Sequence, residues 1–241
     1  MRFRIVTYNI HKGIGGIDRR YRPERIVETL AHYQPDIVFM QEVDDGVPRS
    51  RGHNQVQWFG DALELNYRIY QPNVRLRLGR YGNAILSRFP LADTHHIELT
   101  VPLKKRRRAL ATHCHLRTEH HRRTLLLVNF HLGLAGYERS IQLKRITSDR
   151  MFQHTHQSTA TIVGGDMNDL WGSLGRRVLE PTGLKPACHP VNTFPAIRPV
   201  RPLDQLFFRG NLQCHNCYRS RTEIARHASD HLPLIAEFEL D

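Results

Sequence analysis

The sequence predicts an α+β fold, a four-layer αββα sandwich in which two packed β-sheets carry helices on their outer faces. Three observations lead to this prediction: the first third of the chain alternates strand and helix patterns, the middle holds a series of short strands, and the last third mixes both. No linker, internal repeat or low-complexity segment interrupts the 241 residues. We therefore expect a single domain spanning residues 1–241.

The first third reads as strand, helix, strand, helix. Residues 2–10 form the first predicted strand, and a helix begins near Pro23 and Glu24, because proline and an acidic residue both favour the first helical turn. Pro35 ends this helix, and residues 37–40 are a short apolar run typical of a buried strand. A loop with glycine and proline then leads to a second helix near residues 54–65.

The rest of the chain predicts shorter elements. Alternating residues and turn signals predict an antiparallel series of strands at residues 67–74, 82–87, 95–99, 109–117 and 124–130. A helix fits residues 137–152, and a short one fits residues 171–179. Further strands are expected at residues 159–164, 193–194, 203–208, 212–218 and 232–240.

The chain is strongly basic, with a formal net charge of +12. This excess favours a polyanionic partner, either nucleic acid or an anionic membrane surface. Much of it lies in two segments, residues 104–108 and 117–123, which could equally be solvated ends of hairpins. No obligate protein partner is indicated.

The composition is that of an ordinary soluble globular protein, with 40% hydrophobic and 24% charged residues. No apolar run is long enough to span a bilayer, and the first predicted strand begins too early to leave room for a signal segment. We therefore expect a cytoplasmic location.

Polar side chains follow several predicted strands at the point where each strand ends. In the clearest case, a β-branched run ends in two glycines, and Asp166 and Asn168 follow at alternate positions. Four other polar clusters follow apolar runs in the same way: Tyr8-Asn9-Ile10-His11, Met40-Gln41-Glu42, Asn129-Phe130-His131-Leu132 and Ser229-Asp230-His231. Polar residues at strand ends, contributed by distant segments, are typical of a catalytic site.

Seven short pieces of the chain occur in the order seen in the endonuclease/exonuclease/phosphatase superfamily, which the sequence resembles from residue 3 to about residue 238. The pieces are Thr7-Tyr8-Asn9, Gln41-Glu42, Gly82-Asn83-Ala84-Ile85-Leu86-Ser87, Asn129-Phe130-His131-Leu132, Gly165-Asp166-Met167-Asn168, Pro202-Leu203-Asp204-Gln205-Leu206-Phe207 and Ser229-Asp230-His231. This metal-dependent group is similar to DNase I, the abasic-site endonucleases, the neutral sphingomyelinases and the inositol polyphosphate 5-phosphatases. The resemblance implies a DNase I-like fold and hydrolysis of phosphoric esters.

The chemistry of this reaction calls for a hard divalent cation. Attack on an anionic phosphodiester requires a cation and hydrogen-bond donors that take up charge on the phosphoryl and leaving oxygens. Proteins hold Mg²⁺ through one or two carboxylates, so Mg²⁺, or Mn²⁺ in its place, is the expected cofactor. We expect Glu42 to be the main ligand, as the matching glutamate is in the superfamily, with support from Asn9 and Asp230.

Five residues are expected to carry the catalysis. Asp166 would orient and deprotonate the attacking water, Asn168 would donate to a phosphoryl oxygen, and His231 would face the phosphate from the other side. A histidine that donates needs an acceptor on its other ring nitrogen, and Asp204 is the candidate for that role. His131 is expected to be a further phosphoryl contact, as the matching residue is in similar enzymes.

Asn83 and Arg108 are expected to contact the substrate, although either residue could instead brace the floor of the site. Each motif also has an ordinary explanation when taken alone. Asp166 and Asn168 after two glycines, for example, would suit a simple turn. The joint occurrence of all the motifs in one order is what favours a catalytic site.

The resemblance fixes the reaction better than the substrate. The residues after Asn9, Ile10-His11-Lys12-Gly13, are similar to those of the small bacterial and sphingomyelinase-like members. The leading hypothesis is a metal-dependent nuclease that cleaves phosphodiester bonds by in-line attack of an activated water. The alternatives are a phospholipid or sphingomyelin-type phosphodiesterase or a phosphoinositide-type phosphatase at a membrane surface, and a catalytically silent binding protein on the same scaffold.

Overall fold

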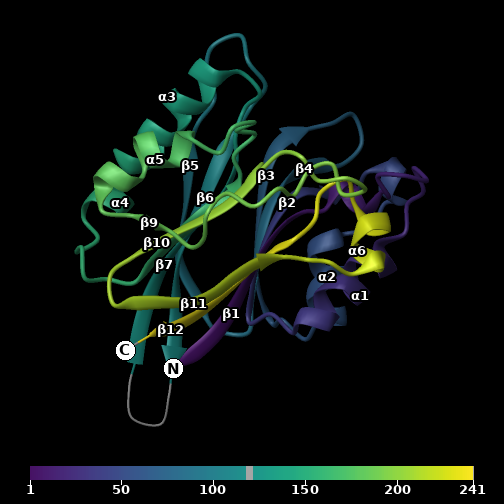
Figure 1. Ribbon diagram of the computed structural model, residues 1–241. Helices are drawn as coiled ribbons and strands as arrows, with labels where there is room; N and C mark the ends of the chain where they lie inside the picture. The colour runs from purple at the N-terminus through teal and green to yellow at the C-terminus, as the bar shows by residue number, and fades with distance from the viewer. Residues whose placement is uncertain (118–121, 241) are drawn as a thin grey trace.

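The computed structural model describes residues 1–117 and 122–240. It contains two six-stranded mixed sheets packed face to face, with helices on the outer face of each sheet (Figure 1). The strand orders are β11-β12-β1-β2-β4-β3 and β5-β6-β7-β8-β10-β9. The predicted four-layer αββα sandwich is confirmed.

The first sheet combines strands from both ends of the chain: β1 (Arg2–Asn9), β2 (Ile37–Asp45), β3 (Tyr67–Arg75), β4 (Arg80–Ser87), β11 (Leu212–Arg219) and β12 (Leu234–Leu240). The second sheet is built from the middle of the chain: β5 (Leu91–Glu98), β6 (Arg108–Arg117), β7 (Arg122–His131), β8 (Thr161–Asp166), β9 (Lys185–Pro186) and β10 (Asp204–Arg209). Most of the predicted basic segment 117–123 lies outside the described residues.

Six α-helices are found in the described part of the chain, in two groups. On the side of the first sheet lie α1 (Pro23–Tyr33), α2 (Gln55–Ala62) and α6 (Glu223–Ala228), and on the side of the second lie α3 (Gly136–Thr147), α4 (Arg150–Gln153) and α5 (Leu174–Val178). Short 3₁₀ turns are η1 (His11–Gly13), η2 (Pro48–Ser50) and η3 (Glu180–Thr182).

Helix α1 begins and ends where the sequence predicts. Pro23 occupies its first turn, and Ile26, Leu30 and Tyr33 recur at helical spacing, so that one face of the helix is buried against the first sheet. Gln34 ends the helix in a left-handed conformation (φ 47°), just before the proline that was expected to stop it.

Two predicted elements differ from the structure. The helix predicted over residues 137–152 is divided into α3 and α4, because the Asp149 carboxylate caps a new helix by accepting a hydrogen bond from the Met151 backbone N–H (2.9 Å). The strand predicted at residues 193–194 is not formed, and Phe194 makes only an isolated bridge with Arg201.

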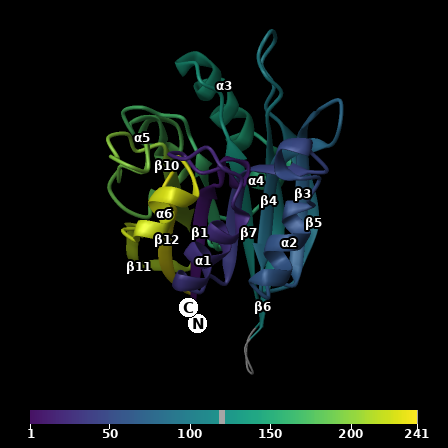
Figure 2. The same cartoon turned by 90° about the vertical axis from the view of Figure 1, so that its right-hand side faces the viewer.

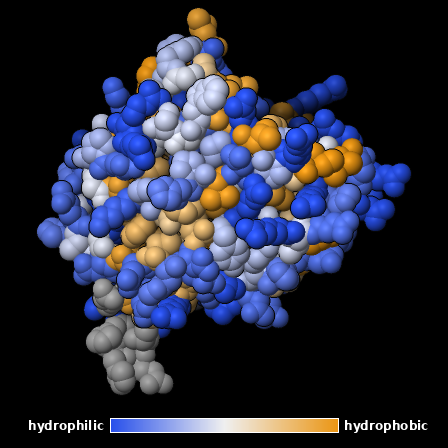
Figure 3. Space-filling model, in the orientation of Figure 1, coloured by the Kyte–Doolittle hydropathy of each residue, from blue (hydrophilic) through white to orange (hydrophobic). Residues whose placement is uncertain are grey.

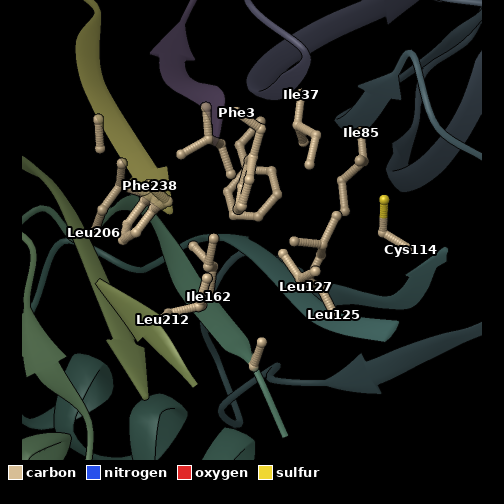
Figure 4. Packing of buried hydrophobic residues seen from close by; sticks show 14 of the residues in the cluster. Phe3, Ile37, Ile85, Cys114, Leu125, Leu127, Ile162, Leu206, Leu212 and Phe238 are labelled. Atoms are coloured by element: carbon tan, nitrogen blue, oxygen red, sulfur yellow. The ribbon is translucent and has the colours of Figure 1, made fainter. Parts of the chain in front are cut away.

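The central strands are apolar on both faces because both faces are covered. In β1, Phe3 and Ile5 belong to the apolar layer between the sheets, whereas Val6 and Tyr8 pack in the layer under the helices. Figure 4 shows side chains of the two sheets pointing toward one another across the inner layer. Burial on both sides explains why these strands read as continuous apolar runs instead of clean alternation.

The centre of each sheet is a pair of parallel strands, β1 with β2 and β7 with β8. The carboxyl ends of these strands lie at the end of the sandwich opposite the two chain termini (Figure 2). The connection between β5 and β6 extends past this same end in both ribbon views. The topology therefore gathers the polar strand ends at one end of the molecule.

The surface at this end offers several apolar side chains. Leu103, Leu134 and Trp171 are exposed in the connections that follow β5, β7 and β8. Figure 3 shows that polar residues cover most of one face of the molecule, with apolar residues in several smaller, separate areas. No helix in residues 1–117 or 122–240 is long and apolar enough to cross a membrane.

One buried side chain ties the two sheets together just below the polar strand ends. Asn129 of β7 donates from Nδ2 to the backbone carbonyls of Met40 (3.0 Å) and Ala84 (2.8 Å) in the first sheet. Its Oδ1 accepts a hydrogen bond from Gln41 Nε2 (2.8 Å). Because the surrounding layer is apolar, these groups have no water to replace a lost partner.

Asn129→Leu should lower the free energy of unfolding by about 3 kcal/mol, because it removes three buried hydrogen bonds at once, two to backbone carbonyls and one from Gln41 Nε2. Urea denaturation followed by circular dichroism measures this change. The matched control is Asn216→Leu, the same substitution at an exposed position of β11. Equal stability of the two variants would show that the sheets do not depend on this link.

Candidate active site

The polar strand ends of the two sheets meet at one place. Asn9 ends β1, Glu42 lies in the last part of β2, His131 ends β7 and Asp166 ends β8. A hydrogen bond from Asn9 Nδ2 to Asp166 Oδ2 (2.9 Å) crosses from the first sheet to the second. Segments that are far apart in sequence are thus joined in one buried polar cluster.

Asp166 is at the centre of this cluster and is only 1% exposed. Its Oδ2 lies 2.9 Å from Asn9 Nδ2, 3.4 Å from His131 Nε2 and 3.8 Å from His231 Nε2. Its Oδ1 accepts a hydrogen bond from the backbone N–H of Asn168 (2.9 Å). Fixed donors therefore hold both carboxylate oxygens, and two imidazole rings lie beside them.

His231 and Asp204 form a buried pair next to Asp166. His231 Nδ1 donates to Asp204 Oδ2 (2.8 Å), which leaves Nε2 on the Asp166 side. The Thr193 hydroxyl donates to the same Asp204 oxygen (2.6 Å), and the Phe194 ring packs against the His231 ring at 4.9 Å between centroids. These contacts fix the orientation of the imidazole.

The pKa values in the cluster are shifted in opposite directions. Burial lowers the pKa of His231, but the charges of Asp204 and Asp166 raise it by more, to about 10. Burial raises the pKa of Asp166 to about 6, because it outweighs the attraction of His231. Burial also holds the pKa of His131 well below its usual range, and the charge of Arg107 acts in the same direction. At neutral pH the site therefore combines a carboxylate, a cationic His231 and a neutral His131.

Asn168 contributes through its backbone and its side chain. Its backbone N–H holds Asp166, and its Nδ2 donates to the Leu132 carbonyl (2.9 Å). The residue adopts a left-handed conformation with φ 50°, which asparagine tolerates better than most residues. Because an amide nitrogen carries two hydrogens, one remains for another acceptor.

Glu42 lies at a bulge in β2. The pairing of β2 with β4 shifts register here, and Glu42 takes a left-handed conformation with φ 60°. A glutamate in this conformation costs about 1 kcal/mol, and such strain is concentrated at functional sites. The Glu42 carboxylate contacts the Lys12 ammonium, and both side chains are 17% exposed.

The same contact keeps Glu42 ionised. Burial raises the pKa of Glu42, but His131, Lys12 and Tyr81 together lower it by more, so that the pKa lies well below its usual range. Because His131 itself is neutral near pH 7, the Lys12 ammonium is the main stabilising partner. Glu42 therefore presents an anionic oxygen at the end of β2.

The other predicted residues lie in the following places. Asp230 is adjacent to His231 and partly exposed, with Oδ1 3.9 Å from His11 Nδ1. Asn83 is buried and donates from Nδ2 to the backbone carbonyl of Arg108 (3.2 Å). The Arg108 side chain forms an ion pair with Glu98 (3.1 Å) at the surface. The structure thus brings Asn83 and Arg108 to each other, and their contact with substrate stays a prediction.

Three residues that sequence reasoning did not assign contribute to the site. Thr193 holds Asp204, but the sequence predicted only a short strand at residues 193–194 and gave no signal for this contact. Arg107 directly precedes β6 and adjoins the predicted Arg108, and only the tertiary structure decides which of the two arginines is buried. Lys12 lies in a turn three residues after Asn9, and only the fold places its ammonium on Glu42.

The donor set fits a hard divalent cation. Ligand atoms of Asp166, Asp204 and His231 lie within 4.8 Å of one another. The two carboxylates of this group could contact a metal ion, whereas the cationic His231 has no free lone pair for one. Asp204 Oδ1 is buried without a hydrogen-bond partner, so one carboxylate oxygen is available there. Glu42 lies outside this group but supplies a further ionised carboxylate. Oxygen donors of this kind suit Mg²⁺ or Mn²⁺ better than a thiophilic metal.

A hollow of about 850 Å³ lies elsewhere on the molecule, near the amino end of β1. Arg2, Asp36, Glu64 and Arg88 are among its lining residues, and no predicted site residue is. The polar cluster is therefore identified by its chemistry and not by the size of a cavity.

The sequence matches the Endonuclease/Exonuclease/phosphatase family over residues 6–231. The chain belongs to this family. Its members are generally hydrolases that act on phosphoester bonds, and they are typically dependent on divalent metals. The resemblance seen in the sequence is thereby confirmed, and the DNase I-like sandwich agrees with it.

One relative in sequence and two solved structures with a similar fold are compared with this chain. The uncharacterized protein YbhP of Escherichia coli (strain K12) is 26% identical over 251 residues, which cover 99% of this chain and 96% of YbhP. The endonuclease/exonuclease/phosphatase structure from Beutenbergia cavernae DSM 12333 has a TM-score of 0.81 and 19% identity, over 99% of this chain and 72% of that one. The structure of D. rerio TDP2 complexed with single strand DNA product has a TM-score of 0.70 and 18% identity, over 99% of both chains.

Asp204→Asn should lower the pKa of His231 from about 10 toward or below the ordinary value of 6.5, because it removes the largest charge that raises the pKa. An NMR titration of the His231 Cε1–H resonance measures the shift. Thr193→Val is the matched control, since it removes a hydrogen bond to the same oxygen but keeps the charge. A His231 pKa that is unchanged in Asp204→Asn would contradict the assigned pairing.

Proposed function

We propose that this family member is a Mg²⁺- or Mn²⁺-dependent phosphodiesterase that hydrolyses nucleic acid. The observation that carries the proposal is the buried array of Asp166, His231 and Asp204. In this array a carboxylate with a pKa of about 6 lies beside a histidine that a second carboxylate keeps cationic. Such a pair can take a proton from water while it donates a hydrogen bond to an anionic phosphate.

Asp166 acts as the general base in this proposal. Its pKa lies just below neutral, so the carboxylate is ionised at pH 7 and still basic enough to accept a proton from water. Asn9 and the Asn168 backbone hold the carboxylate in place. The water attacks phosphorus in line with the leaving oxygen, and its proton passes to Asp166. The P–O bond to the leaving group breaks, and the departing oxygen takes up a proton from solvent.

The donors of the site stabilise the charge that develops on the phosphoryl oxygens. His231 donates from Nε2, since its Nδ1 hydrogen is committed to Asp204. Asn168 donates the second hydrogen of its Nδ2, and His131 is a further neutral contact. These groups are already oriented by the fold, so little reorganisation accompanies the reaction.

Glu42 would hold the divalent cation, with Asn9 and Asp230 as further oxygen donors. When bound, the cation neutralises charge on the phosphate and the leaving oxygen. On the chain itself, the Lys12 ammonium keeps Glu42 in the ionised form that a cation requires.

The surface supports a nucleic acid as the substrate. The net charge of +12 favours a polyanion. The exposed Trp171 ring, with the Arg201 guanidinium 5.2 Å from its centroid, offers a flat surface on which a base can stack. The structure of D. rerio TDP2, which has the same fold, is a complex with a single strand DNA product.

Hydrolysis of bis-p-nitrophenyl phosphate should require Mg²⁺ or Mn²⁺ and should be abolished by EDTA. Glu42→Gln and Asp166→Asn should each lower turnover by about 10²- to 10⁴-fold, because they remove the cation ligand and the general base. The matched controls are the same changes at exposed positions, Glu223→Gln and Asp93→Asn, which should keep full activity. Wild-type turnover in Asp166→Asn would remove this residue from the mechanism.

Parallel assays with supercoiled plasmid, single-stranded RNA and sphingomyelin vesicles identify the natural substrate. We expect metal-dependent cleavage of DNA or RNA and none of sphingomyelin. Cleavage of sphingomyelin alone would show that the protein is a lipid phosphodiesterase and not a nuclease.

The pH profile of kcat/KM should show two limbs. Asp166 must be deprotonated, so activity should fall about tenfold per unit as the pH drops below about 6. His231 must be protonated, so activity should also fall as the pH rises above about 10. In Asp204→Asn the alkaline limb should move to lower pH. A profile that stays flat from pH 8 down to pH 4 would contradict the role of Asp166.

A further inference from the structure

Several cations surround one tyrosine ring beside the active site. The ring centroid of Tyr81 lies 5.0 Å from Lys105 Nζ, 5.4 Å from the Arg49 guanidinium carbon and 5.8 Å from Lys12 Nζ. Tyr81 is near the start of β4 and is 5% exposed. We refer to Lys12, Arg49, Lys105 and Arg107 as the Tyr81 cation cluster.

Arg107 is the buried member of the cluster. It is 5% exposed, and its Nε is buried without a hydrogen-bond partner. Within residues 1–117 and 122–240 its side chain forms no ion pair, whereas the adjacent Arg108 pairs with Glu98. A guanidinium that is removed from water without an anion is costly, so a ligand that supplies one would be strongly favoured.

The position of Arg107 links the cluster to the catalytic residues. Its charge is, after burial, the largest influence that lowers the pKa of both His131 and Lys105. His131 in turn has its Nε2 3.4 Å from Asp166 Oδ2. Arg107 and Lys105 therefore lie close enough to His131 to act on its charge, beside the proposed general base.

Two of the four cations are already neutralised by carboxylates. Arg49 makes a two-point contact with the buried Asp44, at 2.8 Å from Nε and 2.7 Å from Nη2, and Lys12 contacts Glu42. Lys105 and Arg107 have no carboxylate partner among the described residues. Their two positive charges are available to a ligand.

We propose that Lys105 and Arg107 bind a second phosphate group of the substrate, next to the phosphate that reacts. This inference rests on the proposed function and adds to it a preference for substrates with phosphates on neighbouring positions. Arginine offers paired N–H donors that match phosphate oxygens, and lysine adds a compact charge. The second phosphate is either a terminal phosphomonoester or the next phosphodiester of a nucleic-acid chain.

The neighbouring basic residues provide an internal comparison. Arg106 lies between Lys105 and Arg107 in sequence but is exposed. Lys104 is also exposed, and its Nζ is 5.4 Å from the Tyr137 ring and not at Tyr81. Lys105 and Arg107 belong to the cluster, whereas Lys104 and Arg106 do not. The substitution Arg106→Gln therefore removes one positive charge from the same segment and leaves the cluster unchanged.

Binding without turnover tests the proposal most directly. In EDTA, isothermal titration calorimetry compares thymidine 3′,5′-bisphosphate with the 3′- and 5′-monophosphates. We expect wild-type protein to bind the bisphosphate about tenfold more tightly than either monophosphate. This preference should fall about tenfold in Arg107→Gln and about threefold in Lys105→Gln, and it should persist in Arg106→Gln. Because Lys105 is exposed, its variant reports on the site even if Arg107→Gln is unstable.

Turnover gives a second measurement. Thymidine 5′-(p-nitrophenyl phosphate) is compared with the same ester carrying a 3′-phosphate, and wild-type kcat/KM should be higher for the second. A substrate with a 3′-linked thymidylate in place of the 3′-phosphate distinguishes a neighbouring phosphodiester from a terminal phosphate. Lys105→Gln should lower kcat/KM only for substrates with the second phosphate.

Two results would overturn the proposal. The first is equal binding of bisphosphate and monophosphates by wild-type protein. The second is an equal loss on both esters in the Lys105 and Arg107 variants, which would place these cations at the reacting phosphate. If neither ester is hydrolysed but the bisphosphate preference and its sensitivity to Lys105→Gln are kept, the proposed function fails while the phosphate site stands.

Discussion

The active site depends on one constraint, a carboxylate buried where two sheets meet. Asp166 ends a strand of the second sheet, and the amide that holds it comes from Asn9 in the first. Burial makes the carboxylate more basic, and the nearby His231 limits that effect so that the group is still ionised at neutral pH. His231 owes its own charge to Asp204, whose position is set by Thr193. A change in any of these contacts therefore alters the protonation of the others.

The backbone conformation at and beside these residues sets the positions of their side chains. Gly165 has φ 138°, and a Cβ at this position would lie 2.0 Å from the Phe130 carbonyl, so the approach of β8 to β7 beside Asp166 requires glycine. Glu42 and Asn168 both adopt left-handed conformations, at φ 60° and φ 50°. The packed sheets supply the stability that maintains these less favourable conformations, and Asn129 links the sheets just behind them.

The positive charge of the chain is organised differently in the site and on the surface. Lys12 and Arg49 are matched to carboxylates and serve to fix Glu42 and Asp44. Arg107 and Lys105 have no carboxylate partner within residues 1–117 and 122–240. Because Arg107 is buried, an added anion would interact with it more strongly than with a surface cation. Surface pairs such as Arg108 with Glu98 are exposed to solvent and contribute little to binding.

Much of the fold and of the site could be predicted from the sequence, because strand ends rich in Asn, Asp, Glu and His mark one end of a sandwich whose core strands are apolar on both faces. Local signals also placed α1 correctly, but they did not reveal the break between α3 and α4 or the irregular segment around Thr193. The sequence by itself determined the residue types that can hold a cation, accept a proton and donate hydrogen bonds to an anion. Only the tertiary structure decided that Arg107 and not Arg108 is buried, that Lys12 meets Glu42, and that Thr193 holds Asp204. These contacts join residues from different elements, and strand register and sheet packing, not local sequence preference, set their distances.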